Sequence, residues 1–430
     1  MSEATPAPDK PTGSTAPAAP SRRDDGLEAR AQGALREMLT SSWLVTVLAI
    51  VLALVISAVL IAAADPEVQD AAGYFFARPG DFFSAVGSAV GGAYLALFQG
   101  AVFDPGANTV ARQIRPITET MTWSVPLILA GLGLGIGFRA GMFNIGAQGQ
   151  IILGAIFAGY IGFAWDLPPV LHLLLGVIGA AVGGAIWAGI AGVLKARTGA
   201  NEVIVTIMLN NIAVYLVAYL LTLTSFKREG SNNPISPVIG ENAAYPLLLG
   251  SQFRLHLGFV VAILAAVFVW WLMNRSTLGF AFRAVGSNPS AARTAGMNVN
   301  RVYILVMVIA GAFAGLAGSA QVLGTEKVLT AGVAASFGFD AITVALLGRS
   351  KPLGTFFAGL LFGALRAGGF AMQSRTGTPI DIVLVVQSLV VLFIAAPPLV
   401  RAVFRLPSPG GRGNAPAAEL SAPVVKEAAA

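Results

Sequence analysis

Long runs without a charged residue recur along this chain from residue 43 to residue 400. A helix rises about 1.5 Å per residue, so about 20 apolar residues cross the roughly 30 Å hydrocarbon core of a bilayer. Charge-free runs of that size lie at residues 43–64, 82–103, 120–138, 143–165, 167–194, 203–226, 255–273 and 302–325. Further runs with one charge each lie at 328–348, 352–374 and 378–400. The pattern predicts an all-α polytopic membrane protein.

Composition supports this class and excludes several others. Charged residues make up 11% of the 430 residues, against roughly 25% in soluble domains, and the mean hydropathy is +0.75. The chain has no Cys, which excludes disulfides, thiol chemistry and cysteine-based metal sites. Two isolated histidines, His172 and His256, leave little material for a zinc site.

The basic residues predict the orientation of the spans, because Lys and Arg in short loops favour the cytoplasmic side. They gather in the N-terminal tail, at Lys195 and Arg197, and in the loop 274–301. These clusters share one side only if an even number of spans separates the tail from Lys195. We therefore leave out 82–103, which is rich in Gly and has acidic flanks. Ten spans remain, with both termini in the cytoplasm, where 18 of the 27 basic residues then lie.

This topology divides the chain into three parts. Residues 1–42 and 401–430 are rich in small and polar residues and are predicted to be disordered cytoplasmic tails. Residues 43–400 form the transmembrane domain, with the loop 274–301 in the cytoplasm. On this topology the formal charge of +6 reflects orientation, and we expect no nucleic-acid partner.

Polar residues inside the spans are the candidates for function, because a central charge costs roughly 2.5–3.5 kcal/mol to insert. No phosphate-binding loop, nucleophile with a base, or metal cluster occurs in the sequence, so we predict no catalytic residue, no bound metal and no enzyme activity. Asn144, Gln148 and Gln150 open one span, separated by glycines. They either line a solute pathway or hydrogen-bond neighbouring helices.

Two further candidates, Asn210 and Asp340, lie deeper in their runs. Glu202 at a helix start is explained by capping, whereas Asn210 lies two turns further in and is a better pathway candidate. Asp340 lies twelve residues from the start of its run. It either pairs with an arginine such as Arg366 or lines a polar cavity.

The loop 274–301 contains the signals of a short helix. Asn288 suits an N-cap, Pro289 suits the first helical position and Gly296 suits the residue after the end. These residues predict a two-turn helix with Arg293 exposed, a docking element for another protein. The alternative is a simple connection, for which 28 residues is long.

Four segments carry a family resemblance. They are FNIGAQGQ at 143–150, ANEVIVTIMLNNIA at 200–213, FRAVGSNPSAARTAGMNV at 282–299 and GFDAITVALLGRSKPLG at 338–354. Together they resemble permease subunits of ABC importers in the branched-chain amino acid/simple sugar permease superfamily, closest to the nucleoside-type branch. The resemblance covers residues 126–397. At Gln148 the family motif usually carries Glu, so a carboxylate role there does not transfer.

The resemblance implies a type II-importer-like permease domain in a bacterial plasma membrane. It implies a second permease subunit, two cytoplasmic ATPase subunits or one fused ATPase, and an extracytoplasmic substrate-binding lipoprotein. ATP and Mg²⁺ would bind those ATPase subunits, and this chain would need no cofactor. Asn144, Gln148, Gln150, Asn210 and Asp340 fall in motifs near the translocation path.

The cytoplasmic motif implies contact with the ATPase. Its residues in this chain are Arg283, Asn288, Pro289, Arg293 and Gly296.

The expected solute is therefore a nucleoside or a related small polar solute such as a simple sugar. Two alternatives remain: an ion-coupled secondary transporter, and an ABC permease for branched-chain amino acids. A secondary transporter favours paired intramembrane carboxylates, and only Asp340 lies well inside a run.

Overall fold

The computed structural model describes residues 42–406 and is built from helices. Within those residues the only β pairing is two isolated bridges, so the predicted all-α class is confirmed. The helices are α2 Ser42–Ala64, α3 Pro66–Gly73, α4 Pro79–Ala101, α5 Val110–Arg139, α6 Ala147–Ala164, α7 Pro169–Thr198, α8 Glu202–Leu220, α9 Gly258–Arg275, α10 Thr277–Ser287, α11 Pro289–Thr294, α12 Val299–Ser319, α13 Phe337–Leu347, α14 Pro352–Thr376, α15 Ile380–Ala395 and α16 Pro397–Val403. A 3₁₀ turn, Glu241–Ala243, precedes α9, and a π-helical turn, Ala320–Thr325, extends α12.

The chain divides into two compact units, residues 1–49 with 396–430 and residues 50–395. Of the first unit, the structure describes the start of α2 and residues 396–406, which hold α16. All the contacts below lie within the second unit. The predicted disordered tails, 1–42 and 401–430, lie almost wholly outside the described residues.

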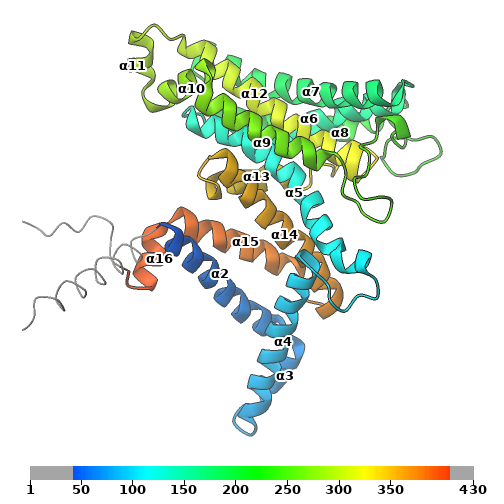
Figure 1. Cartoon of the computed structure of the whole chain (residues 1–430), viewed down its shortest axis with the longest axis vertical. Coiled ribbons are helices and arrows are strands. Elements are labelled where there is room, and N and C mark those ends of the chain that lie inside the picture. The colour runs from blue at the N-terminus through cyan, green and yellow to red at the C-terminus, as the bar shows by residue number, and fades with distance from the viewer. Residues whose placement is uncertain (1–41, 407–430) are drawn as a thin grey trace, which may run out of the picture. The chain divides into compact units, whose positions relative to one another are not determined.

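Glycines bring α7 and α12 into close contact. Gly311 packs against the backbone of Gly184, and Gly315 packs against Ala180, so that a side chain at either glycine would overlap the facing helix. Helix α6 runs beside both (Figure 1). Small residues allow such close approach, which supplies the van der Waals contact that holds membrane helices together. Gly179 and Gly183 of α7 pack in the same way against Ile161 and Phe157 of α6.

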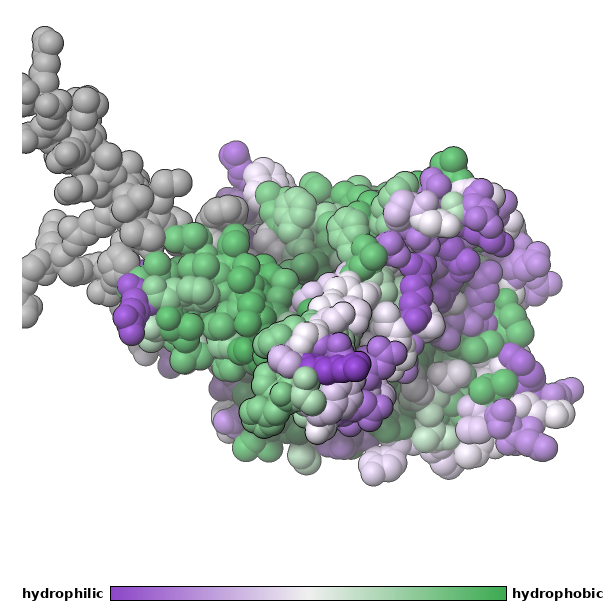
Figure 2. All heavy atoms as spheres, turned by 90° about the horizontal axis from the view of Figure 1, so that it is seen from below, coloured by the Kyte–Doolittle hydropathy of each residue, from purple (hydrophilic) through white to green (hydrophobic). Residues whose placement is uncertain are grey.

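The outer faces of these helices are apolar. Exposed large hydrophobic residues follow one face of α7 at intervals of three or four: Leu171, Leu174, Ile178, Val182, Ile186 and Ile190. Figure 2 shows broad hydrophobic areas on the surface of the chain. In water such a surface would aggregate, whereas in a bilayer it faces lipid. The exposed stripes therefore support a membrane location.

Helix α5 is the most deeply buried long helix and organises the rest of the unit. It packs along α14, where Gly359 faces Ile128 and Gly363 faces Ser124. It also contacts α9, α12 and α13. Its 30 residues span about 45 Å, enough to connect the two ends of the helical unit.

Nine described helices are long and apolar enough to cross a membrane, or ten if α15 and α16 form one bent span. The polytopic class is thus confirmed, but the expectation of a continuous helical span at 328–348 is wrong. Only α13, eleven residues long, is helical there, and the residues before it form turns and loop. The run is interrupted at Ala335, which has a φ of +39°. Irregular backbone at such depth requires surrounding protein, which α5, α6 and α14 provide.

The segment 82–103, which the sequence argument left out, forms α4 and is long and apolar enough to count as a span. It packs mainly against α14 and also contacts α3 and α5. Gly92 lies near Thr376, and Gly100 lies against Ala371 and Gly368. Its first half extends past the end of α14 (Figure 1). The lost span at 328–348 and the added span at 82–103 leave the number of spans unchanged, but they change the positions of the spans along the chain.

Candidate functional site

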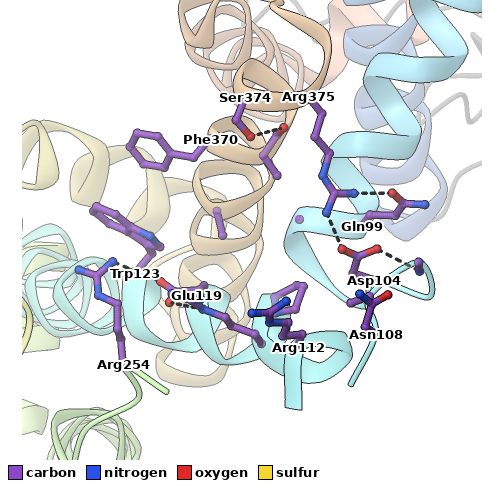
Figure 3. Close-up of a pocket in the computed structure, with 17 residues that line it drawn as sticks. Gln99, Asp104, Asn108, Arg112, Glu119, Trp123, Arg254, Phe370, Ser374 and Arg375 are labelled. Carbon is purple, nitrogen blue, oxygen red and sulfur yellow. Dashed lines mark hydrogen bonds and ion pairs between the residues drawn. The ribbon is translucent and has the colours of Figure 1, made fainter. Parts of the chain in front are cut away.

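A polar cavity of about 930 Å³ lies beside the first half of α5. Its walls come from the end of α4, the loop after α4, the start of α5, the segment before α9 and the last turns of α14 (Figure 3). The lining residues are Gln99, Gly100, Asp104, Gly106, Ala107, Asn108, Arg112, Arg115, Pro116, Glu119, Trp123, Arg254, Ala367, Phe370, Ala371, Ser374 and Arg375. The cavity is large enough for a small polar solute.

Four arginines and two acidic residues give the lining a net positive charge. Glu119 lies 3.4 Å from Arg254 and 3.7 Å from Arg115. Asp104 pairs with Arg375 at the end of α14. The arginine side chains in these pairs are 41–55% exposed. Exposed pairs of this kind contribute about 0–1 kcal/mol, so they shape a wet, charged wall more than they stabilise the fold.

Aromatic rings form part of the cavity wall. The ring of Trp123 stacks on Phe370 with centroids 5.4 Å apart, and both residues line the cavity. Behind them lies Phe337, the buried first residue of α13, 6.0 Å from the Trp123 ring. The guanidinium groups of Arg254 and Arg366 lie 6.0 Å and 5.1 Å from that ring. Both are within the range of cation–π attraction.

Asp340 lies just beyond this aromatic layer and is paired. Arg366 donates from Nη1 to the Asp340 carboxylate at 3.1 Å and to the Ser336 hydroxyl at 3.1 Å. Ser336 in turn donates to Asp340 at 2.7 Å. The contact is the ion pair that the sequence left open as one alternative. Asp340 is not among the cavity-lining residues, and its pathway role stays a prediction.

Gln148 joins α6 to the start of α13. Its side-chain amide donates to the Ala335 carbonyl at 2.6 Å and accepts from the Gly338 N–H at 2.9 Å. A side chain at Gly338 would overlap the Gln148 backbone, so this close approach requires glycine. The amide therefore binds backbone groups that the short helix would otherwise leave unpaired.

Asn144, Gln150 and Asn210 hold the non-helical segment between α5 and α6. Asn144 and Gln150 bond each other reciprocally at 3.1 Å. Asn210 accepts from the Gly149 N–H at 2.8 Å and donates to the Ile145 carbonyl at 2.9 Å. The Asn210 bonds join α8 to the start of α6, whereas the Asn144–Gln150 pair is local to residues 144–150. None of the three residues lines the cavity, and their pathway role remains untested.

The predicted short helix of the loop 274–301 is confirmed as α11. Asn288 caps it by accepting from the Ala291 N–H at 3.0 Å, Pro289 is its first residue, and Gly296 ends it with a φ of +83°. Arg293 is exposed. The preceding helix, α10, contains Arg283, which is partly buried with no hydrogen bond to Nη1.

Helix α10 is fixed to the bundle by glycine contacts. Gly279 packs against Leu272 of α9, and Gly286 packs against Ala140, just after α5. The loop 274–301 contains α10 and α11 and is called the α10–α11 loop below. The cavity and this loop thus lie at opposite ends of α5 (Figure 1). Helix α9 joins the same two ends, since Arg254 precedes it and α10 follows it.

A buried histidine fixes the segment between Arg254 and α9. His256 accepts from the Gly258 N–H at 3.1 Å, and its ring stacks on Tyr245 with centroids 5.4 Å apart. Burial, together with the nearby charges of Arg254 and Lys327, lowers the His256 pKa to about 4. The imidazole is therefore neutral at pH 7 and acts as a structural hydrogen-bond acceptor.

Most of the cavity was not predicted from the sequence, because the candidates were polar residues inside charge-free runs. The cavity instead uses charged residues at helix ends and an aromatic ring, Trp123. The spacing of Arg115 and Glu119, one helical turn apart, is the signal that could have revealed a charged face. The contributions of Arg254 and Arg375 depend on tertiary structure and have no local signal.

Comparison with known proteins identifies the family of the chain. Residues 117–395 match the family model described as branched-chain amino acid transport system / permease component. The chain belongs to this permease family. It is therefore a multi-pass membrane component of an ABC transport system, as the four sequence motifs indicated. Such components work with ATPase and substrate-binding partners.

Three relatives are informative. The chain is 39% identical over 297 residues to the guanosine ABC transporter permease protein of Bacillus subtilis, covering 69% of this chain and 85% of that protein. It is 39% identical to the glucose ABC transporter permease protein of Haloferax volcanii, covering 65% and 75%. It is 36% identical to the nucleoside ABC transporter permease protein of Lactococcus lactis, covering 65% and 79%. No solved structure matches the chain significantly.

Proposed function

We propose that this permease imports a nucleoside or a related small polar solute, such as a simple sugar, and that its polar cavity is the extracytoplasmic entrance to the pathway. The observation that carries the proposal is the separation of the cavity from the α10–α11 loop by the length of α5. The basic loop favours the cytoplasm, so the cavity opens on the other side.

The chemistry of the cavity suits a neutral, hydroxyl-rich ring compound. Arginine and carboxylate side chains offer donors and acceptors to hydroxyl groups and ring heteroatoms. The Trp123 ring offers a flat apolar face. Nucleosides and sugars share both features, and the names of the three relatives include both classes.

The complete importer needs partners. We expect a second, different permease subunit, two cytoplasmic ATPase subunits or one fused ATPase, and an extracytoplasmic lipoprotein that selects the solute, in a bacterial plasma membrane. ATP and Mg²⁺ would bind the ATPase subunits, and the permease itself would perform no chemistry. The short helix α11, with Arg293 exposed, is the proposed docking element for the ATPase.

Uptake by the reconstituted complex tests this function. With ATP and the lipoprotein present, we expect uptake of labelled guanosine or glucose into proteoliposomes, and competition by unlabelled nucleosides and sugars identifies the class. Ion-driven uptake by this chain alone would contradict the ABC mechanism.

The coupling role has a separate test. Arg293→Glu should abolish ATP-driven uptake while the permease remains in the membrane, because Arg293 is exposed and the change removes only the proposed ATPase contact. Deletion of residues 288–296, which removes α11, should have the same effect on uptake. Arg301→Glu, in the same basic loop but after α11, is the matched control. Unchanged uptake by the Arg293→Glu complex would exclude this docking role.

A further inference from the structure

Helix α13 is a short element between two strained bends. Ala335, just before it, has a φ of +39°, and Arg349 and Ser350, just after it, each have a φ of +53°. Non-glycine residues in this region cost of order 1–3 kcal/mol each and cluster where elements switch conformation. Eleven helical residues thus lie between two candidate hinges.

Two side chains of different kinds hold the start of this helix. Gln148 binds the backbone at Ala335 and Gly338. Arg366 binds only side chains, the Ser336 hydroxyl and the Asp340 carboxylate. The amide clamp fixes the backbone to α6, whereas the arginine contact can break without disturbing any helix.

The arginine contact is also not fully buried. The side chains of Arg366 and Asp340 are 18% and 20% exposed. A fully buried pair leaves an unpaired charge when it opens, which is costly. The Trp123 and Phe337 rings lie within cation–π distance of Arg366 and stabilise its charge when the carboxylate is released, so this pair is suited to repeated opening.

Arg366 connects α13 to the aromatic part of the cavity wall. Its guanidinium lies 4.6 Å from the Phe337 ring and 5.1 Å from the Trp123 ring. Trp123 stacks on Phe370 at the cavity wall. One arginine therefore touches both the carboxylate of α13 and the rings at the cavity wall.

We propose that Trp123 and Phe337 form the gate at the inner end of the cavity and that Arg366 latches it shut through Ser336 and Asp340. Opening is a turn of α13 about its two end bends, in which the Arg366 contact and the two Gln148 bonds break and Phe337 moves away from Trp123. The inference rests on the proposed function, because a gate needs a pathway.

The same helix is connected to the α10–α11 loop through contacts. Gly286 of α10 packs on Ala140, at the start of the segment that the buried amides hold. That segment leads into the first turn of α6, where Gln148 binds α13. A displacement of the loop can therefore reach the gate through packed backbone.

The first test measures solute leak in proteoliposomes that contain the whole complex without ATP. Trp123→Ala and Arg366→Gln should each raise the efflux of preloaded solute about tenfold, the change that corresponds to about 1.4 kcal/mol in the closed-to-open equilibrium. Arg366→Lys keeps the charge and should leak less than Arg366→Gln. Trp271→Ala, at an exposed ring on α9, is the control and should not leak.

Leak within twofold of wild type in both test variants, with the complex assembled and wild-type uptake intact, would overturn the gate and leave the proposed function standing. Absence of ATP-driven uptake by the wild type would instead refute the function.

A second measurement does not depend on altering the gate. The chain has no Cys, so spin labels can be attached at Phe339→Cys on α13 and Phe357→Cys on α14, both exposed positions. We expect the distance between the labels to change between the nucleotide-free and ATP-bound complex. A distance that is the same in every nucleotide state would overturn the hinge.

Discussion

The α6–α7–α12 region and the α5–α13–α14 region differ in how they are held together. In the first, glycines bring backbones into contact, and Asn210 of α8 bonds the start of α6 through its buried amide. In the second, glycines also pack α14 on α5, but half-exposed ion pairs and stacked rings line a cavity and strained bends flank α13. Close packing favours a single arrangement, whereas breakable contacts permit two. We therefore expect the α6–α7–α12 region to act as a rigid frame and the α5–α13–α14 region to move.

The largest effect on stability is expected at the glycine contact. Gly315→Val should lower the free energy of unfolding by about 3 kcal/mol, because the new side chain overlaps Ala180 and Gly184. Thermal unfolding of the purified permease in detergent measures it. Gly87→Val on α4, where an added Cβ meets nothing within 4 Å, should leave the midpoint unchanged. Equal midpoints for both variants would contradict the rigid frame.

A smaller loss is expected in the buried amide network. Asn210→Leu should destabilise the fold by about 2 kcal/mol, because it leaves the Gly149 N–H and the Ile145 carbonyl buried without partners. Asn211→Leu is the matched control, since its exposed amide bonds only Ile207 of its own helix. If the two variants unfold together, the network does not support the frame.

Stability should also depend on pH through His256. Its pKa is about 4 when folded and about 6.5 when unfolded, so only the unfolded chain gains the proton between these values. Stability therefore falls as pH drops below 6.5, by about 1.4 kcal/mol at pH 5.5.

Unfolding midpoints at pH 7 and pH 5.5 measure this loss. His256→Gln should remove most of the difference, and His172→Gln, which leaves His256 in place, should retain it. An unchanged pH dependence in His256→Gln would show that another group is responsible.

The smallest effect is expected at the cavity wall. Arg115→Gln should change the free energy of unfolding by less than about 0.5 kcal/mol, because its pair with Glu119 is exposed and 3.7 Å long. The same unfolding assay measures it. A loss above about 1.5 kcal/mol would mean that the cavity wall is part of the rigid frame, which removes the contrast between the two regions.

The sequence predicted the fold class and the short helix α11 because both depend on local signals. Charge-free runs identify membrane helices, and Asn288, Pro289 and Gly296 mark the limits of α11. The break before α13 was not predicted, because the run 328–348 has no charge except Asp340 and contains no proline. Its cause is tertiary: Gln148 of α6 bonds the backbone at Ala335, where the break lies.

The candidate site was predicted less well for a similar reason. Single residues such as Asp340 and Gln148 were identified, but their partners were not all evident from the sequence. The cavity joins residues 99–123, Arg254 and the end of α14, which no sequence spacing connects. A charged residue at a helix end can reflect either the orientation of the span or a role in a site, and only its neighbours in the structure distinguish the two.

The central claim is that the cavity and the α10–α11 loop lie on opposite sides of the membrane, and side-specific labelling tests it most directly. In this cysteine-free chain, Asn108→Cys at the cavity wall and Ser290→Cys on α11 are treated with a membrane-impermeant maleimide in intact cells. We predict that Asn108→Cys is labelled in intact cells and Ser290→Cys only after permeabilisation. Labelling of both positions from outside, or the reverse pattern, would contradict the account.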